Sequence, residues 1–459
     1  MEEHKRDQRT DALTPRVGSE TGRAVVIEPW LKQAARYPAR GADARPPEAR
    51  LAEASGLARA IDLNVVQEGL VTLTAIRPAT YIGKGKVDEI AGIVRSLSAS
   101  VVVMDCPISP VQQRNLEKAW GAKVIDRTGL ILEIFGRRAR TREGSLQVEL
   151  AHLTYQKGRL VRSWTHLERQ RGGFGFLGGP GETQLEADRR IIEERIKRIE
   201  GELEGVKRTR ALHRESRKRV PYPIVALVGY TNAGKSTLFN RLTQAAVLSA
   251  DMLFATLDPT LRAVDLPHGA RVILSDTVGF ISDLPTMLVA AFRATLEEVV
   301  EADIILHVRD VSHDETEAQS HDVRKILVEL GINDSDPRLI EVWNKIDRLD
   351  SQERTRVFNL AERLSDRHKR AAVSALSGEG IDRLLDVIEM RLGETRRMLQ
   401  VSIDASDGAG LSWLYRHSEV LSRKLRDDGT LAVNLRADPK NAELVKHRYP
   451  GAIESKPSN

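Results

Sequence analysis

A glycine-rich segment of eight residues follows an apolar run and opens a helical pattern near the middle of the chain. It matches the phosphate-binding loop G-x-x-x-x-G-K-[ST], with a strand expected over 223–228 and a helix from 237. The glycines let the backbone wrap around phosphates, so that amide N–H groups point inward beside the positive end of the helix dipole. The segment therefore predicts a nucleotide-binding α/β domain. Its residues are Gly229, Tyr230, Thr231, Asn232, Ala233, Gly234, Lys235 and Ser236.

Two short segments predict a magnesium site and a γ-phosphate sensor. Lys235 is expected to reach the β- and γ-phosphates, and the Ser236 hydroxyl to ligate Mg²⁺. Asp276 follows the apolar strand predicted over 270–274 and is expected to hold Mg²⁺ through a water, while the Gly279 amide senses the γ-phosphate. Mg²⁺ is therefore predicted as an essential ion. The second segment, D-x-x-G, consists of Asp276, Thr277, Val278 and Gly279.

Two later segments predict which base is bound. Guanine presents N1–H and a 2-amino group side by side, and the Asp347 carboxylate can accept from both, whereas adenine offers neither donor. Asn344 is expected to read guanine N7 and tie its loop to the phosphate loop, Lys345 to lie along the base, and the Ala375 amide to meet O6. Four segments in this order, each after a predicted strand, predict hydrolysis of GTP to GDP and phosphate. The two base-reading segments are Asn344, Lys345, Ile346 and Asp347, and Ser374, Ala375 and Leu376.

A mobile loop between these segments must supply a threonine that ligates Mg²⁺ and contacts the γ-phosphate. Thr256 is the predicted ligand, and Thr260 is the alternative, although it fits better as the start of the next strand. Loss of the γ-phosphate would release this loop. Thr256, with Lys235 and Gly279, is thus predicted to be catalytic. The loop residues assigned to nucleotide binding are Phe254, Ala255, Thr256, Leu257 and Asp258.

Two positions bear on the rate of hydrolysis. Many small GTPases place a glutamine directly after D-x-x-G to orient the attacking water, but this chain has Phe280 there. Slow intrinsic hydrolysis is therefore predicted, with the missing group supplied by a partner, a cation or another loop. Asn232 either helps to bind K⁺ beside the phosphates, as in GTPases similar at this place, or forms a hydrogen bond that stabilises the loop.

The rest of the chain predicts a multidomain α/β protein. A mostly parallel sheet flanked by helices on both faces is expected for the GTPase domain, after a small α/β domain and an antiparallel helical hairpin. The predicted parts are a disordered tail over 1–22, the small domain over 23–138, the hairpin over 139–220, the GTPase domain over 221–396 and a small α/β domain over 397–459.

Alternating patterns predict the elements of the outer domains. In the first domain we expect strands over 23–28, 70–75, 100–105 and 122–126 and helices over 47–62, 85–97 and 110–120. In the last we expect a strand over 399–404, a helix over 410–426, a strand over 430–435 and a helix over 441–447. Two apolar stripes flank the glycine-rich segment 171–181 and predict hairpin arms of about 45 Å. They are Leu146, Leu150, Leu153, Leu160, Trp164 and Leu167, with Lys157 in a polar slot, and Leu185, Ile192, Ile196, Ile199, Leu203 and Val206, with Arg189 in a polar slot.

Composition narrows the setting of the protein. The 459 residues include one cysteine, Cys106, so no intramolecular disulfide forms, and no apolar run reaches the roughly 18 residues of a membrane span. A soluble cytoplasmic monomer is expected. The net charge of +5 favours an acidic partner such as RNA, although ordinary solvated helix faces would also explain it. The basic clusters are Arg137, Arg138, Arg140 and Arg142 before the hairpin and Arg208, Arg210, Arg214, Arg217, Lys218 and Arg219 after it.

Several of these segments together resemble the HflX family of GTPases. The signature over 171–190, the segment 83–86, the helix 147–159 and the GTPase motifs carry the resemblance, while Gly178 departs from the arginine that many members have. The resemblance implies a cytoplasmic GTPase that binds the large ribosomal subunit and its rRNA. It also implies separation of the subunits of stalled or idle ribosomes under stress, with the first domain and the hairpin making the contacts.

Two other functions are compatible with the motifs. One is a GTPase of ribosome assembly or RNA modification, and the other is a nucleotide-gated scaffold that binds proteins.

Overall fold

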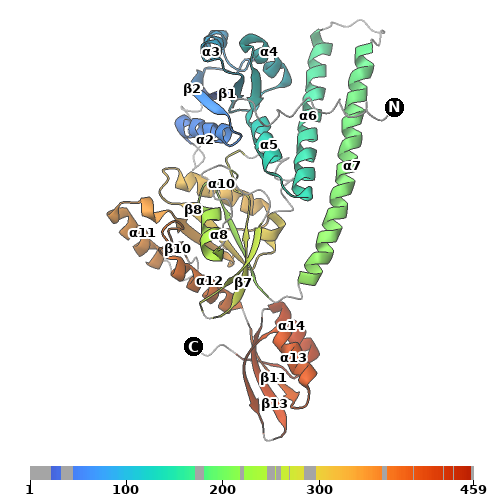
Figure 1. Cartoon of the computed structure of the whole chain (residues 1–459), viewed down its shortest axis with the longest axis vertical. Helices are drawn as coiled ribbons and strands as arrows, with labels where there is room; N and C mark the ends of the chain where they lie inside the picture. The colour runs from blue at the N-terminus through green and yellow to red at the C-terminus, as the bar shows by residue number, and fades with distance from the viewer. Residues whose placement is uncertain are drawn as a thin grey trace, which may run out of the picture. The chain divides into compact units, whose positions relative to one another are not determined.

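A computed structural model describes most of the chain (Figure 1). Residues 1–21 of the predicted tail, the glycine-rich segment with Gly178, and Thr256 lie outside the described residues. The side chains of 161–185, 207 and 210–217 are not described either. Three separate sheets organise the described part. The described residues are 22–32, 45–170, 180–217, 222–244, 254, 260–267, 269–283, 296–363, 370–395, 397–426, 428–437 and 439–455.

The first sheet is parallel, as the βαβ pattern predicts. Its strands are β1 (Arg23–Leu31), β2 (Asn64–Leu73), β3 (Val101–Met104) and β4 (Lys123–Asp126), in the order β2-β1-β3-β4. The helices are α2 (Pro47–Arg59), α3 (Lys84–Ser96), α4 (Pro110–Trp120) and α5 (Arg127–Arg138).

Two details of this domain differ from the expectation. Strand β2 begins at Asn64 rather than at residue 70, because it pairs with β1 from Arg23 onward. The exposed Asn64, Gln67 and Glu68 of this edge strand hid its first half in the sequence pattern. Helix α5 was not predicted, since it follows β4 without a loop that would mark its start.

Helices α6 (Arg142–Gln170) and α7 (Pro180–Arg217) form the predicted antiparallel pair (Figure 1). Leu146, Ile199 and Leu203 are buried between them, with Leu150 and Leu153 packed alongside. Three ion pairs join the two helices. Their residue numbers rise along α6 while they fall along α7, as in an antiparallel pair. They join Arg142 to Glu202 at 3.5 Å, Glu149 to Arg195 at 2.7 Å and Lys157 to Glu193 at 3.1 Å.

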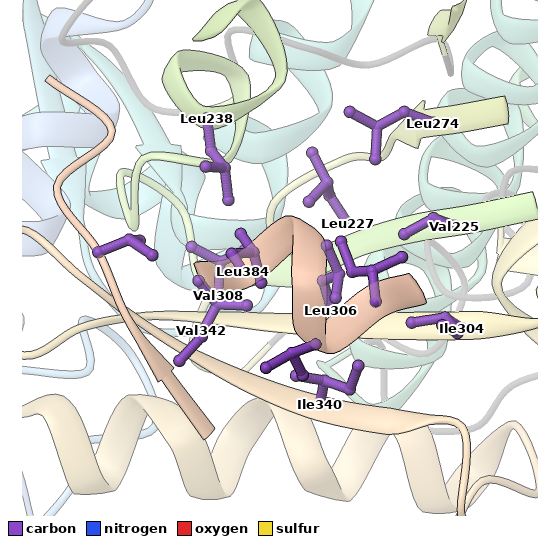
Figure 2. Close-up of a cluster of buried hydrophobic side chains, with 14 of the residues drawn as sticks. Val225, Leu227, Leu238, Leu274, Ile304, Leu306, Val308, Ile340, Val342 and Leu384 are labelled. Atoms are coloured by element: carbon purple, nitrogen blue, oxygen red, sulfur yellow. The ribbon is translucent and has the colours of Figure 1, made fainter. Parts of the chain in front are cut away.

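The second sheet has six strands in the order β10-β9-β8-β5-β7-β6. Only β6 is antiparallel to its neighbour, so five strands end at the same edge. Apolar side chains from the strands and from helices α8 and α12 form one buried cluster (Figure 2). The strands are β5 (Ile224–Gly229), β6 (Thr260–Asp265), β7 (Arg271–Asp276), β8 (Ile304–Asp310), β9 (Leu339–Asn344) and β10 (Arg370–Ala372); the helices are α8 (Lys235–Thr243), α10 (Thr316–Glu329), α11 (Ser351–Arg363) and α12 (Ile381–Thr395), with the 3₁₀ helix η1 (Ile346–Arg348).

The third sheet is antiparallel and corrects one prediction. The helix expected over 410–426 ends at His417, and Glu419–Leu425 forms a strand that pairs with Thr430–Ala437. Gly429 adopts φ +79° in the turn between them, which favours glycine. The Asp428-Gly429 pair is typical of such a hairpin turn, and the helix prediction over 410–426 did not use this signal. The elements are β11 (Arg397–Asp404), α13 (Gly408–His417), β12 (Glu419–Leu425), β13 (Thr430–Ala437), α14 (Pro439–Arg448) and β14 (Ile453–Ser455), and the strand order is β12-β13-β11-β14.

The α6–α7 interface yields a stability prediction. Ile199 is 0% exposed, whereas Ile191 on the same helix is 61% exposed. Ile199→Ala should therefore lower the local unfolding free energy of the helix pair by about 2–4 kcal/mol, because it leaves a cavity. Amide hydrogen exchange of α6 and α7 measures this loss, with Ile191→Ala as the matched control. Equal protection factors in the two variants would contradict the packing described here.

Candidate functional site

The phosphate-binding loop joins β5 to α8 and requires glycine at two positions. Gly229 has φ +155°, and a Cβ there would lie 2.2 Å from the carbonyl oxygen of Val308. Gly234 has φ +92°, and a Cβ there would lie 2.2 Å from Asn344 Nδ2. The two glycines therefore let the loop pass close to β8 and to the residue at the end of β9.

Lys235 lies at the first turn of α8 and is buried. Its ammonium donates to the carbonyl oxygens of Gly229 at 3.1 Å and Tyr230 at 2.8 Å. Burial lowers the pKa of Lys235 to about 8, while Asp276 opposes the shift and Lys345 adds to it. A nearby anion, such as a nucleotide phosphate, would therefore stabilise the charged form and raise this pKa.

Two oxygen ligands suited to a hard cation meet beside the loop. The Ser236 hydroxyl donates to Asp276 Oδ2 at 2.9 Å, which brings the ends of α8 and β7 together. A hydroxyl and a carboxylate fit Mg²⁺, which takes few protein ligands and completes its shell with phosphate and water oxygens. Among the described residues, no group of three or more His, Cys, Asp or Glu side chains could hold a metal ion.

The D-x-x-G segment lies against the phosphate loop. Phe280 N donates to Gly229 O at 3.1 Å, and Thr231 N donates to Phe280 O at 2.7 Å. A Cβ on Gly279 would lie 3.0 Å from the Cα of Thr231 and 2.9 Å from its Cγ2, so glycine lets this backbone pass close to the phosphate loop. The Phe280 side chain is 1% exposed and offers no polar group to a water in the site.

The Asn344 side chain connects two of the predicted loops. Its Nδ2 donates to Ala233 O at 2.9 Å, and its Oδ1 accepts from the Ala375 amide at 3.0 Å. The tie to the phosphate loop agrees with the expectation. The Ala375 amide was expected to face guanine O6; here it already has an acceptor, so an O6 contact would require this hydrogen to be shared.

Asp347, the predicted base-reading carboxylate, is exposed at its loop and is oriented by Ser374. Ser374 Oγ donates to Asp347 Oδ1 at 2.6 Å and accepts from Ser377 N at 3.0 Å. Ile346, between Asn344 and Asp347, is fully buried and anchors the loop.

Three contacts were missed by the sequence analysis. Arg241 of α8 donates to the carbonyl oxygen of Ala375 at 3.1 Å and also to the carbonyl oxygen of Leu376. Leu376 itself is 72% exposed. Lys345 has φ +67°, and its ammonium lies 2.8 Å from Asp310 at the end of β8. No local motif marks these partners, because they come from other strands and helices.

Other predicted residues have mixed outcomes. Phe254 is described, and its side chain is buried, which does not favour direct contact with a nucleotide. The residues Ala255, Thr256, Leu257 and Asp258 lie outside the described part, while Thr260 begins β6 as expected. Asn232 is exposed with φ +59°, and among the described residues its side chain makes no hydrogen bond that would stabilise the loop.

Comparison with known proteins agrees with this geometry. Family models match residues 48–136 (GTP-binding GTPase N-terminal), 138–217 (GTP-binding GTPase Middle Region), 224–345 (50S ribosome-binding GTPase) and 359–458 (HflX C-terminal domain). GTPase HflX of Magnetococcus marinus is 51% identical over 393 residues, which are 85% of this chain and 88% of that protein. The chain belongs to the HflX family.

A second relative extends the comparison. GTPase HflX of Escherichia coli is 45% identical over 80% of this chain and 86% of its own length. A solved GTP-binding protein of Sulfolobus solfataricus in complex with GDP has a TM-score of 0.43 and 23% identity over 81% of this chain and 98% of that chain, too distant for the sites to be compared. The family models and the two HflX relatives show that this HflX-family member is an enzyme that binds and hydrolyses GTP.

The described part of this HflX-family chain has no helix with both the length and the apolar character of a membrane span.

The Ser374–Asp347 contact predicts a specific loss of affinity. Ser374→Ala should weaken GDP binding about fivefold to tenfold, because Asp347 loses the hydroxyl that orients it. Ser377→Ala, which changes a nearby serine that does not donate to Asp347, is the control. Calorimetric titration with GDP measures both variants, and equal affinities would contradict the orienting role.

The depressed pKa of Lys235 predicts proton uptake on binding. Well below pH 8, Lys235 is charged in both the free and the GDP-bound protein. As the pH rises through 8, the lysine of the free protein loses its charge, so GDP affinity should fall by up to about tenfold per pH unit. Calorimetry at pH 8 in two buffers of different ionisation enthalpy should show uptake of about half a proton. Lys235→Arg, which stays charged, should remove the uptake, and no uptake by the natural chain would refute the shift.

Proposed function

We propose that this HflX-family GTPase uses GTP and GDP states to control its binding to the large ribosomal subunit, and that it separates the subunits of stalled or idle ribosomes under stress. The main support for control by GTP and GDP is the hydrogen-bond network in which Asn344 joins the phosphate loop to the loop after β10. The match of residues 224–345 to the model described as a 50S ribosome-binding GTPase supports the ribosomal part.

The proposed roles follow from the chemistry at the strand ends. Lys235 neutralises charge on the β- and γ-phosphates, the Gly279 amide binds the γ-phosphate, and Asp347 accepts from guanine N1–H and the 2-amino group. Ser236 and Asp276 would hold Mg²⁺, which supplies positive charge to the phosphates when bound. Thr256 remains the proposed additional ligand.

Intrinsic hydrolysis is proposed to be slow, because Phe280 replaces the group that would orient water. Asn232 is proposed to bind K⁺, since its exposed amide is not engaged within the described loop. GTPase rates in KCl should therefore exceed those in NaCl at equal ionic strength, and Asn232→Ala should remove the difference. Equal rates for the natural chain would eliminate the K⁺ site.

The basic clusters around the hairpin are the proposed RNA contacts, with one exception. Arg137 donates to Ile61 O at 2.7 Å and pairs with Asp62 at 3.1 Å, so it acts within its own domain. Arg142 pairs with Glu202 at 3.5 Å but keeps an 80% exposed side chain, and Arg208 is exposed, so both remain accessible to phosphates. Contacts of this kind weaken steeply with salt.

Sedimentation with ribosomal particles tests the proposal. At low salt the protein should co-sediment with large subunits in a non-hydrolysable GTP analogue and deplete 70S particles, with less binding in GDP. Asp347→Asn should lose this response to the guanine analogue and regain it with the xanthine analogue, because the amide donates where the carboxylate accepts. The natural chain with the xanthine analogue is the control. Large-subunit binding that ignores the nucleotide, or association with immature subunits alone, would contradict the proposal.

A further inference from the structure

A buried carboxylate lies three residues before Asn344, on the face of the sheet opposite the apolar cluster of Figure 2. Glu341 of β9 is 7% exposed. In the sheet register it stands between His307 of β8 and Arg370 of β10. A charged residue at this depth requires partners, and it has them from four elements.

Three arginines and an indole surround the Glu341 carboxylate. Arg370 Nε lies 2.8 Å from Oε2, Arg309 Nη1 of β8 lies 3.7 Å from the same oxygen, and Arg324 of α10 donates to Oε1. Trp343 Nε1 donates to Oε2 at 3.2 Å, and the Arg370 guanidinium lies 5.0 Å from the Trp343 ring centroid. One side chain therefore connects β8, β9, β10 and α10.

The charges of this group favour a fixed arrangement. Burial opposes ionisation of Glu341, but Arg309, Arg370 and Arg324 outweigh it and hold the pKa of the carboxyl below its usual value. Arg309 is itself buried, so it depends on this carboxylate and on Glu317, which lies at the surface. Loss of the Glu341 charge would leave adjacent guanidiniums to repel one another.

The three connected strands are those whose ends carry the base-reading loops. Strand β8 ends at Asp310, which holds Lys345; β9 ends at Asn344; and Ser374 follows β10 closely. Backbone bonds continue this connection toward the loops, since Val373 N donates to Trp343 O at 2.8 Å. A shift of one strand against its neighbour would thus move one base-reading loop relative to the others.

We propose that Glu341 is a positioning residue for guanine recognition, because it holds β8, β9 and β10 in the register that brings the Asp347, Asn344 and Ala375 loops to one base. The inference rests on the proposed base-reading role of these loops. Glu341 does not touch the nucleotide; it acts through the strands that carry Asn344, Lys345 and Ser374.

The test compares two ligands that differ in one group. GDP carries the guanine 2-amino group and IDP lacks it, so the ratio of their affinities reports how well Asp347 is placed. Glu341→Gln keeps an acceptor for Trp343 but removes the charge, and should reduce the GDP-over-IDP ratio about fivefold. Arg370→Gln, which removes one partner while Arg324 still pairs with Glu341, should reduce it less.

A matched variant separates positioning from stability. Ile304→Val changes a buried residue at the opposite end of β8 and should lower the melting temperature while leaving the GDP-over-IDP ratio unchanged. If Glu341→Gln lowers the melting temperature but preserves the ratio, Glu341 is only structural and the proposal is wrong. If the natural chain itself shows no preference for GDP over IDP, the base-reading assignment fails instead.

Discussion

The structure of the site depends on one buried side-chain amide. Asn344 donates to the carbonyl of Ala233 and accepts from the amide of Ala375, so it joins the phosphate loop, the end of β9 and the loop after β10. Gly234 has no side chain because the Asn344 amide occupies that space. The phosphate loop and the proposed base-reading loops are therefore connected, and GTP would be held by loops that are already in contact.

Buried polar side chains on the strands and helices next to these loops support this unit. Lys235 and Asp276 face the phosphate side, whereas Asp310, Glu341 and Ser374 fix the base side. Burying such groups is unfavourable unless each has a partner, so the network tolerates few alternative arrangements. The backbone of Phe280 also belongs to this network, because its bonds align the D-x-x-G segment with the phosphate loop, while its ring is buried and offers no polar group to a water.

The sequence predicted those parts of the fold that depend on local pattern. Strand-end motifs identified the four loops, and apolar spacing identified the α6–α7 pair, because both signals are contiguous in the chain. It did not predict β12, whose formation depends on pairing with β13, or the first half of β2, where exposed Asn64, Gln67 and Glu68 flank two valines. It also missed Arg241, Asp310 and Glu341, since Arg241 reaches a carbonyl 135 residues away and nothing near it in the chain marks that contact.

Guanine selection by the linked loops is proposed to depend on Asp347. Competition against a fluorescent GDP analogue bound to the full chain tests it directly, because only ligands of this pocket displace the probe. Unlabelled GDP should displace the analogue stoichiometrically, whereas ADP at about a hundredfold higher concentration should leave it bound. Displacement by ADP and GDP at similar concentrations would contradict the claim.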